Sequence, residues 1–562
     1  MTDPRPWLKH YPPGVPTEID LGRYASVVSM FDEACVRHPQ RPAYSSFGKT
    51  ITYAQLDQAS ARFAAFLANE WKLAKGDRLA IMLPNLLQYP VALFGALRAG
   101  LTIVNVNPMY TARELEHQLA DSGAKSIVVL ENFAATLAEA IGKTQVEHVI
   151  VTSIGDMLGF PKGPLVSFAV KHIKKMVPRW SLPGHLCFGD VLSKGTGLQA
   201  PKVQLGHDDI AFLQYTGGTT GVAKGAMLSH GNMVANTLQL SAWVGSLFIA
   251  GEEKIVTALP LYHIFSLTVN ALFMTHFGGE NILITNPRDI PAFVKTLKHN
   301  HWTSITGVNT LYNALLNHPD FASVDFSRVK FALAGGMAVQ RAVAERWKAT
   351  TGIPLIEGYG LSEASPVATA NRLDIKDYTG SIGLPLPSTD IQLRDDAGNL
   401  VATGEPGEIC VRGPQVMQGY MNRPEETAKV LDAEHWVSTG DIARMDENGL
   451  FYIVDRKKDM ILVSGFNVYP NEIEDVVARH PGVLEVAAIG VPDEHSGEVV
   501  KLFVVKKDPA LTEAALKQYC HDELTGYKRP KYIEFRKELP KSNVGKILRR
   551  ALRDEENKKA TH

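Results

Sequence analysis

Short apolar runs alternate with amphipathic segments over most of the first 380 residues. The run from Arg78 to Leu83 is bounded by turn residues, which is typical of a buried strand, and the pattern from Tyr89 to Ala99 predicts a helix. Thr111 and Glu114 have the spacing of a capping box and predict the start of another helix. Further strands are expected at 101–105, 126–130, 255–260, 303–307, 330–334 and 353–356. Strands that alternate with helices predict an α/β fold with doubly wound, mainly parallel sheets.

The pattern changes after about residue 380. Short strand-like runs separated by Gly, Pro and Asp predict a small antiparallel β unit over about 380–457. Beyond the charged run 455–459, we expect helices at 471–479 and 512–524 and strands at 483–491 and 499–506. Because 562 residues are too many for one core, we predict a large N-terminal domain, 1–457, and a small α+β C-terminal domain, 458–562.

Composition excludes several classes of protein. Lys and Arg number 58 against 59 Asp and Glu, so no net charge indicates nucleic acid as a partner. The four cysteines are far apart and form no CxxC pair, which argues against a disulfide scaffold or a structural zinc site. The N-terminus shows no signal peptide, and polar residues interrupt the longest apolar run, 256–279, which is therefore interpreted as buried core rather than a membrane span. We expect a cytoplasmic protein.

The stretch from Tyr215 to Gly225 carries the most specific chemistry. Glycines let the backbone approach an anion closely, so that successive amides can point at phosphate oxygens. Threonine hydroxyls and the ammonium of Lys224 add donors. The stretch is not a Walker A loop, because Ala223 precedes the lysine and no Ser or Thr follows it. Taken alone, it is also compatible with an ordinary Gly/Thr-rich surface loop.

Five further motifs follow in the chain: 334–337 (AGGM), 357–363 (EGYGLSE), 438–441 (STGD), 461–474 (ILVSGFNVYPNEIE) and 539–550 (LPKSNVGKILRR). Singly, each is compatible with a turn or a charged loop. Together with 215–225, and in this order, they resemble the adenylate-forming (AMP-binding) superfamily. The resemblance implies that ATP or AMP is bound by Tyr215, Thr216, Gly217, Gly218, Thr219, Thr220, Gly221, Lys224, Gly335, Gly336, Glu357, Gly358, Tyr359, Gly360, Ser362, Asp441 and Arg456.

The resemblance also implies roles in catalysis. Lys546, Thr219 and Glu363 are the expected catalytic residues, and Thr219 and Glu363 are expected to hold Mg²⁺. Coenzyme A, a cosubstrate with ATP, is expected at Ser464, Gly465 and Phe466. Lys458 falls at the hinge about which the C-terminal domain of the family rotates.

The acid is indicated by wider similarity. The strings 84–95, 258–265 and 436–465 resemble bacterial long-chain fatty-acid–CoA ligases. This implies ATP-dependent formation of acyl-AMP with release of pyrophosphate, then transfer to coenzyme A, feeding β-oxidation and lipid metabolism. His263, Phe265 and Val308 are the expected acyl pocket. A CoA ligase for aryl or medium- and short-chain acids is the nearest alternative; a carrier-loading adenylation domain, a luciferase-like oxidase and a non-catalytic lipid-binding protein are more distant ones.

The segment 165–180 mixes basic and apolar residues. We predict from it, and from the resemblance, peripheral association with the inner face of the cytoplasmic membrane. A solvated basic helix is the alternative interpretation. The resemblance further implies a homodimer, with the fatty acid, ATP and coenzyme A as small-molecule partners.

Overall fold

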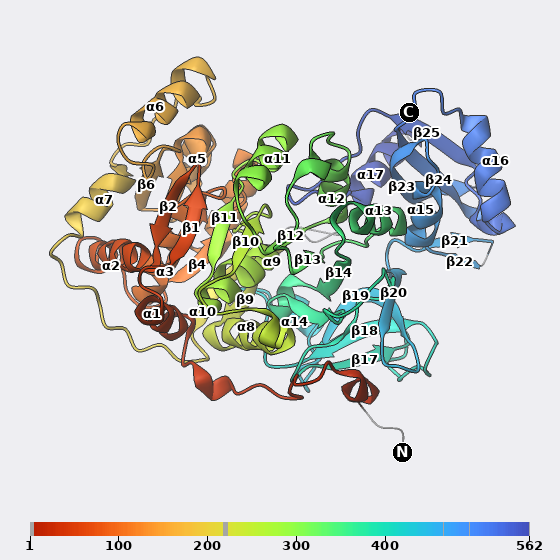
Figure 1. Cartoon of the computed structure of the whole chain (residues 1–562), viewed down its shortest axis with the longest axis horizontal. Helices are drawn as coiled ribbons and strands as arrows, with labels where there is room; N and C mark the ends of the chain where they lie inside the picture. The colour runs from red at the N-terminus through yellow and green to blue at the C-terminus, as the bar shows by residue number, and fades with distance from the viewer. Residues whose placement is uncertain (1–4, 217–222, 465, 494, 561–562) are drawn as a thin grey trace.

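The computed structural model describes residues 5–216, 223–464, 466–493 and 495–560. Two large, mainly parallel sheets occupy the first two thirds of the chain (Figure 1), and a smaller antiparallel sheet and a C-terminal α+β unit follow them. The predicted α/β fold class is therefore confirmed. The predicted boundary between 457 and 458 stays a prediction.

The seven-stranded sheet is parallel except for its last pair. Its order is β7 (Leu186–Cys187), β6 (His148–Thr152), β5 (Ser126–Leu130), β3 (Arg78–Met82), β4 (Thr102–Asn105), β8 (Ile210–Thr216) and β9 (Lys224–Ser229). The hairpin of β8 and β9 thus forms one edge, and the segment that joins these two strands is the predicted phosphate loop.

The nine-stranded sheet is parallel from β14 to β1 and antiparallel at both edges. Its order is β16 (Leu384–Pro385), β15 (Val367–Ala370), β14 (Leu355–Gly360), β13 (Phe331–Ala334), β12 (Ser304–Gly307), β10 (Lys254–Thr257), β11 (Glu280–Leu283), β1 (Pro42–Ser46) and β2 (Lys49–Thr52). Since parallel strands end at a common edge, the motifs after β13 and within β14 lie side by side.

Two smaller sheets complete the fold. The antiparallel one has the order β17 (Asp390–Arg394), β18 (Gly407–Arg412), β19 (Val437–Met445) and β20 (Phe451–Arg456). The C-terminal one has the order β22 (Phe466–Val468), β21 (Ile461–Val463), β24 (Gly497–Lys506) and β23 (Val483–Asp493), with β25 (Tyr532–Arg536) parallel to β24.

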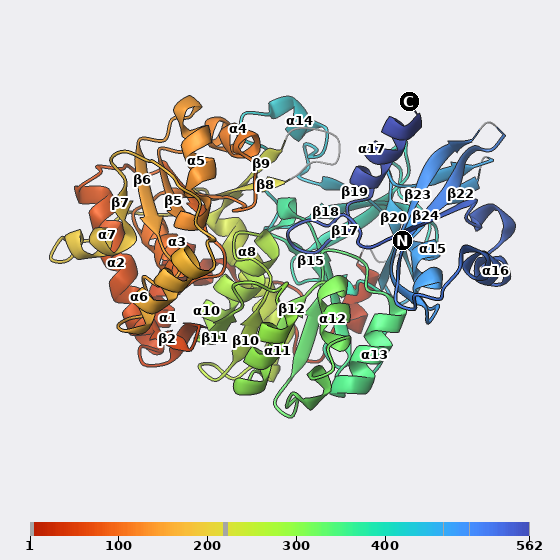
Figure 2. The same ribbon diagram turned by 90° about the horizontal axis from the view of Figure 1, so that it is seen from above.

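Helices pack on the two large sheets and on the C-terminal sheet (Figure 2). They are α1 (Val27–Arg37), α2 (Tyr53–Asn69), α3 (Gln88–Arg98), α4 (Ala112–Ser122), α5 (Ala134–Ala140), α6 (Lys162–Phe168), α7 (Phe188–Lys194), α8 (His230–Val244), α9 (Ile264–Ser266), α10 (Phe273–Phe277), α11 (Ile290–His299), α12 (Asn309–Leu316), α13 (Arg341–Thr351), α14 (Pro424–Ala428), α15 (Pro470–Ala478), α16 (Glu513–Glu523) and α17 (Arg549–Ala560). The predicted capping box is present, because the Thr111 side chain accepts from Glu114 N and the Glu114 carboxylate accepts from Thr111 N.

The cores explain why these elements pack as layers. One cluster joins α11, α12 and α13 to one face of the nine-stranded sheet, through residues such as Phe293, Tyr312 and Trp347. The C-terminal sheet has its own clusters on both faces, one against α15 and α16 and one against α17. The apolar run 256–279 is almost entirely buried in the first part of the chain, and within the described ranges no helix has the length and apolar character needed to span a membrane.

Candidate active site

A single cavity of about 1650 Å³ is lined by both the first part of the chain and the C-terminal unit. Its wall contains nearly every predicted site residue that the structure describes: Tyr215, Thr216, Lys224, His263, Phe265, Val308, Gly335, Gly336, Glu357, Gly358, Tyr359, Gly360, Ser362, Glu363, Asp441, Arg456, Lys458 and Lys546. Gly217, Gly218, Thr219, Thr220 and Gly221 lie outside the described residues, so their predicted roles stay predictions.

The phosphate side of the cavity is built at the β8–β9 hairpin. The Lys224 ammonium forms an ion pair with Glu426 of α14 and lies 5.1 Å from the ring centre of Tyr420. The Tyr420 hydroxyl donates a hydrogen bond of 2.7 Å to Glu363 Oε1. The predicted phosphate lysine and the predicted metal carboxylate are therefore both held by one segment, 417–428.

Backbone pairing fixes that segment against β9. The amide of Met421 donates to Gly225 O at 2.8 Å, and the amide of Met227 donates to Gly419 O at 2.9 Å. The amide of Met417 donates to Glu363 O at 2.8 Å. Sequence reasoning missed Tyr420 and Glu426, and no motif or spacing in the sequence distinguishes them, because their importance arises only from this long-range pairing.

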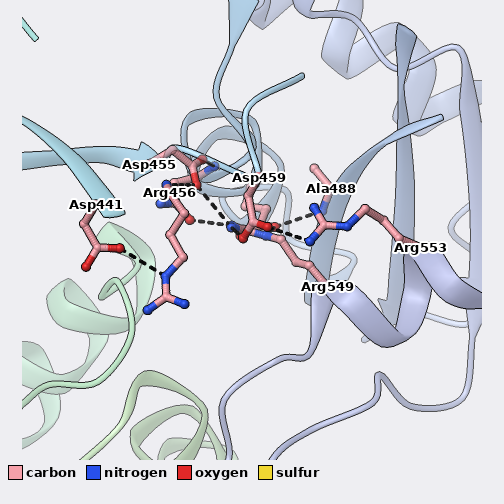
Figure 3. A network of polar contacts seen from close by, with 9 residues as sticks. Asp441, Asp455, Arg456, Asp459, Ala488, Arg549 and Arg553 are labelled. Carbon is pink, nitrogen blue, oxygen red and sulfur yellow. Dashed lines mark hydrogen bonds and ion pairs between the residues drawn. The ribbon is translucent and has the colours of Figure 1, made fainter. Parts of the chain in front are cut away.

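The predicted nucleoside contacts Tyr359, Asp441 and Arg456 lie on β14, β19 and β20. The Tyr359 hydroxyl donates to Asp441 Oδ2 at 2.8 Å, and Arg456 Nε lies 3.1 Å from Asp441 Oδ1 (Figure 3). An ionised carboxylate only accepts hydrogen bonds, so it suits a pair of ribose hydroxyl donors. Gly336 has a φ of +78°, a conformation that favours glycine.

Glu357 is a predicted nucleotide contact whose carboxyl group is buried. It is 7% exposed, and Val339 N donates to its Oε1 at 3.4 Å. Its Oε2 receives no hydrogen bond from the described residues. Burial raises the pKa of this carboxyl to about 8. At neutral pH it therefore holds a proton, and it can both donate to and accept from a planar base edge.

Lys546 enters the cavity from the C-terminal unit. Its amide donates to Ser542 Oγ at 3.1 Å, and the carbonyl of the preceding Gly545 accepts a 2.9 Å hydrogen bond from Thr310 Oγ1 of α12. Burial, followed by the nearby positive charge of Arg456, lowers the pKa of Lys546 to about 8. A desolvated ammonium interacts strongly with an anion, because little water screens it. Lys546 of the terminal loop and Lys224 of the β8–β9 hairpin, more than 300 residues apart in the chain, thus line one cavity, as the motifs imply.

An apolar arm of the same cavity runs along β13. Phe331, Leu333 and Gly335 are two residues apart, so they share one face of this edge of the cavity. Leu240, Trp243 and Val244 of α8 line the arm from another side. Phe331 and Phe273 both line the cavity, and each ring contacts Phe248, with ring centres 5.4 Å and 5.6 Å apart.

The predicted pocket residues lie where this arm meets the polar end. A Cβ atom on Gly335 would lie only 3.1 Å from Phe265 Cε1, so the ring packs directly against the glycine. Burial, followed by the charge of Lys546, lowers the pKa of His263 to about 4, which keeps the imidazole neutral. Val308 Cγ2 lies 3.2 Å from the position that a Cβ atom on Gly545 would take. His263, Phe265 and Val308 are thus grouped, and their binding of an acyl chain stays a prediction.

The predicted coenzyme A residues lie elsewhere. Ser464 and Phe466 are exposed and do not line the cavity, and the Phe466 ring stacks on Tyr527 at 4.7 Å between centres. Gly465 lies outside the described residues. The cavity therefore contains the lysine of the terminal loop but not the predicted thiol channel.

Comparison with known proteins decides the family. The sequence profile described as "AMP-binding enzyme" matches residues 31–421, and the one described as "AMP-binding enzyme C-terminal domain" matches residues 472–546. The chain belongs to the AMP-binding enzyme family. A long-chain-fatty-acid–CoA ligase from Escherichia coli O157:H7 is 59% identical over 549 residues, 98% of each chain. One from Bacillus subtilis (strain 168) is 41% identical over 99% of each chain.

Among solved structures, an anthranilate CoA ligase in complex with anthranoyl-AMP superposes with a TM-score of 0.84 at 25% identity. The comparison covers 96% of this chain and 98% of that one. The order of the motifs, the fold and the family membership therefore agree over nearly the whole chain.

Proposed function

We propose that this enzyme is an ATP-dependent ligase that converts long-chain fatty acids into fatty acyl-CoA through an acyl-AMP intermediate. The observation that carries the proposal is the single cavity whose wall combines apolar residues of β13 and α8 with Lys546, Lys224 and Asp441. The 59% identity to a long-chain-fatty-acid–CoA ligase, against 25% to an anthranilate CoA ligase, supports a fatty acid over an aryl acid. The product would supply β-oxidation and lipid metabolism.

In the first step, a carboxylate oxygen of the acid bonds to the α-phosphorus of ATP. The bond from that phosphorus to the bridging oxygen breaks, and pyrophosphate leaves with the electron pair. Two anions must approach each other, so the site has to supply positive charge. Lys546 and Lys224 provide ammonium groups on the cavity wall, while Asp441 orients the ribose. These groups act by positioning and by electrostatic stabilisation of the transition state.

Mg²⁺ fits the donors that are present. Among the described residues there is no cluster of three or more His, Cys, Asp or Glu side chains able to hold a metal alone. Mg²⁺ usually binds one or two carboxylates, water and substrate phosphates, and Glu363 offers one such carboxylate oriented by Tyr420. Bound there with ATP, the ion would neutralise phosphate charge.

In the second step, the thiol sulfur of coenzyme A bonds to the acyl carbonyl carbon, its proton passes to solvent, and the bond to AMP breaks. We propose that the C-terminal unit rotates about Lys458 between the steps. Support comes from Ser464 and Phe466, which lie outside the cavity while Lys546 lines it. A rotation of the C-terminal unit would withdraw Lys546 from the cavity and bring Ser464 and Phe466 toward it.

The experiment is pyrophosphate release with fatty acids of six to eighteen carbons, with benzoate and anthranilate for comparison. Catalytic efficiency that rises with chain length beyond octanoate supports the proposal; no gain beyond octanoate, or a preference for aryl acids, refutes it. The Lys546→Ala variant should lose acyl-AMP formation by roughly a hundredfold or more while it retains thioester formation from supplied acyl-AMP.

We further propose that the enzyme collects its acid at an anionic membrane surface, through an apolar patch on and beside α6. Five large side chains there are exposed: Phe160 by 92%, Leu165 by 64%, Phe168 by 58%, Ile173 by 70% and Met176 by 54%. Lysines lie among them, and α6 is followed by a π-helical turn, Ala169–Ile173, that ends before residue 180. An amphipathic helix with this composition binds anionic lipid headgroups while its apolar face enters the interface.

Vesicle flotation tests the membrane proposal. The double variant F160E/I173E should no longer float with vesicles that contain phosphatidylglycerol, but should retain activity on detergent-dispersed palmitate. Leu400→Glu is the matched control, because Leu400 is 65% exposed on the antiparallel unit instead. Equal flotation of the double variant and the control contradicts the proposal.

A further inference from the structure

A buried group of charges joins the first part of the chain to the C-terminal unit (Figure 3). Asp455, in β20, is fully buried. Its Oδ2 accepts a 2.8 Å hydrogen bond from the amide of Asn471, and its Oδ1 lies 3.3 Å from Arg549 Nη1. Asp455 precedes the predicted hinge residue Lys458, whereas both of its partners follow it.

The contact with Asn471 caps a helix. Asn471 is at the beginning of α15, and the N-cap residue of this helix, Tyr469, provides no side-chain hydrogen bond of its own. The first amides of a helix lack partners within the helix, and a carboxylate there is favoured by the helix dipole. The cap of α15 is therefore supplied by a residue on the other side of the hinge.

The contact with Arg549 leads to the catalytic loop. Arg549 begins α17, three residues after Lys546. Its guanidinium also lies 2.7 Å from Glu474 and 3.4 Å from Asp459, both of which belong to the C-terminal unit. Asp455 is thus tied to α15 and to α17, the helix that directly follows the loop of Lys546.

We infer that Asp455 is a positioning residue that latches the C-terminal unit in the arrangement that places Lys546 in the cavity. The inference rests on the proposed function and on rotation about Lys458. Any such rotation must break the contacts to Asn471 and Arg549 together, because they lie on the other side of the hinge. The released Asp455 would then face water.

The network also makes the latch reversible. Arg549 keeps Glu474 and Asp459 after release, so no buried guanidinium is left without a partner. Burial raises the pKa of Asp455 to about 6, which means that the loss of hydration offsets part of the attraction to Arg549. A contact that is only modestly favourable can be made and broken in each catalytic cycle.

The test separates the two half-reactions. Asp455→Asn keeps the shape and an acceptor for the Asn471 amide but removes the negative charge. We expect acyl-AMP formation to slow at least tenfold, while thioester formation from supplied acyl-AMP is unchanged or faster. Asp455→Ser, which retains a capping oxygen, provides a second variant in case the amide is poorly tolerated. The same selective loss is expected.

Arg553→Gln is the matched control. Arg553 pairs with Asp459 at 2.7 Å in the same network, but both residues belong to the C-terminal unit. Removing this pair should affect both half-reactions alike. If Asp455→Asn and Asp455→Ser also slow both half-reactions equally, or change neither, the latch is refuted.

A measurement without substrate separates this inference from the proposed function. The run Arg456, Lys457 and Lys458 is a trypsin site at the hinge. We expect Asp455→Asn to accelerate cleavage there relative to the wild type and to Arg553→Gln, and equal rates would overturn the latch. If cleavage accelerates but the wild type activates no fatty acid, the proposed function fails and the latch stands.

Discussion

The apolar arm along β13 makes a quantitative prediction about chain length. From Phe331 to Gly335 the strand advances about 13 Å, at roughly 3.3 Å per residue. An extended acyl chain, with bonds of about 1.5 Å, advances roughly 1.3 Å per carbon, so this distance accommodates about ten carbons. Leu333, 8% exposed, lies midway on the same face of the strand. We therefore expect its side chain to contact the middle of a long acyl chain.

Leu333→Phe adds three carbon atoms to the wall at that point. If these displace three methylenes, the loss is about 2.4 kcal/mol, at about 0.8 kcal/mol for each buried methylene. The ratio of kcat/KM for hexadecanoate to that for hexanoate should fall about 50-fold, since 1.4 kcal/mol corresponds to about a factor of ten. The KM for ATP should be measured alongside, because Leu333 Cδ1 lies only 3.6 Å from the position of a Cβ atom on Gly358, a predicted nucleotide contact.

Coupled pyrophosphate assays with even-numbered acids from six to eighteen carbons provide the ratio. Leu355→Phe is the control, because Leu355 is equally a buried leucine of the sheet but packs in the opposite core, near α12 and α13. Overpacking costs each variant about 1–3 kcal/mol of stability, but only Leu333→Phe should alter the length profile. An equal loss on hexanoate and hexadecanoate refutes an acyl arm along β13.

Two further predictions concern the polar end of the cavity. Burial lowers the pKa of Lys546 to about 8, so the free enzyme loses this positive charge as the pH rises through 8. We therefore expect kcat/KM for ATP to fall above pH 8. In the Lys546→Arg variant, this fall in kcat/KM should occur at a higher pH. The Glu426 carboxylate pairs with the ammonium of Lys224, so Glu426→Gln should free that charge for ATP and lower the KM for ATP several-fold, with little change in kcat. Glu425→Gln is the control and should leave the KM for ATP unchanged. Equal KM values for the two variants contradict this prediction.

The order of local elements could be predicted from sequence, but not how they pair. The run from Arg78 to Leu83 and the capping box at Thr111 are local signals, and the structure has β3 and α4 there. That β3 lies between β4 and β5, or that β1 joins the sheet beside β11, depends on contacts between distant residues. No local pattern encodes such pairings.

Some residues of the candidate site could likewise be predicted from local motifs, and others could not. Gly335, Tyr359 and Asp441 belong to motifs with recognisable spacing, and all three line the cavity. Tyr420 has no such signal, since an isolated Tyr is common in any sequence, and Asp455 is marked only as the first residue of the charged run 455–459. Their significance depends on the hydrogen bond to Glu363 and on the cap of α15, which exist only in the folded chain.

Acid selection and the change between half-reactions should be separable. The residues that line the apolar arm all precede the hinge, whereas Lys546 follows it. We therefore expect a movement of the C-terminal unit to withdraw Lys546 from the cavity without changing the apolar residues that contact the acyl chain. Effects of distant residues without shared partners add within about 0.5 kcal/mol. A variant with both Leu333→Phe and Asp455→Asn should thus combine the length profile of the first with the half-reaction defect of the second. A double variant whose losses in acyl-AMP formation depart from the product of the single losses by more than about threefold would mean that the latch also shapes the acyl arm.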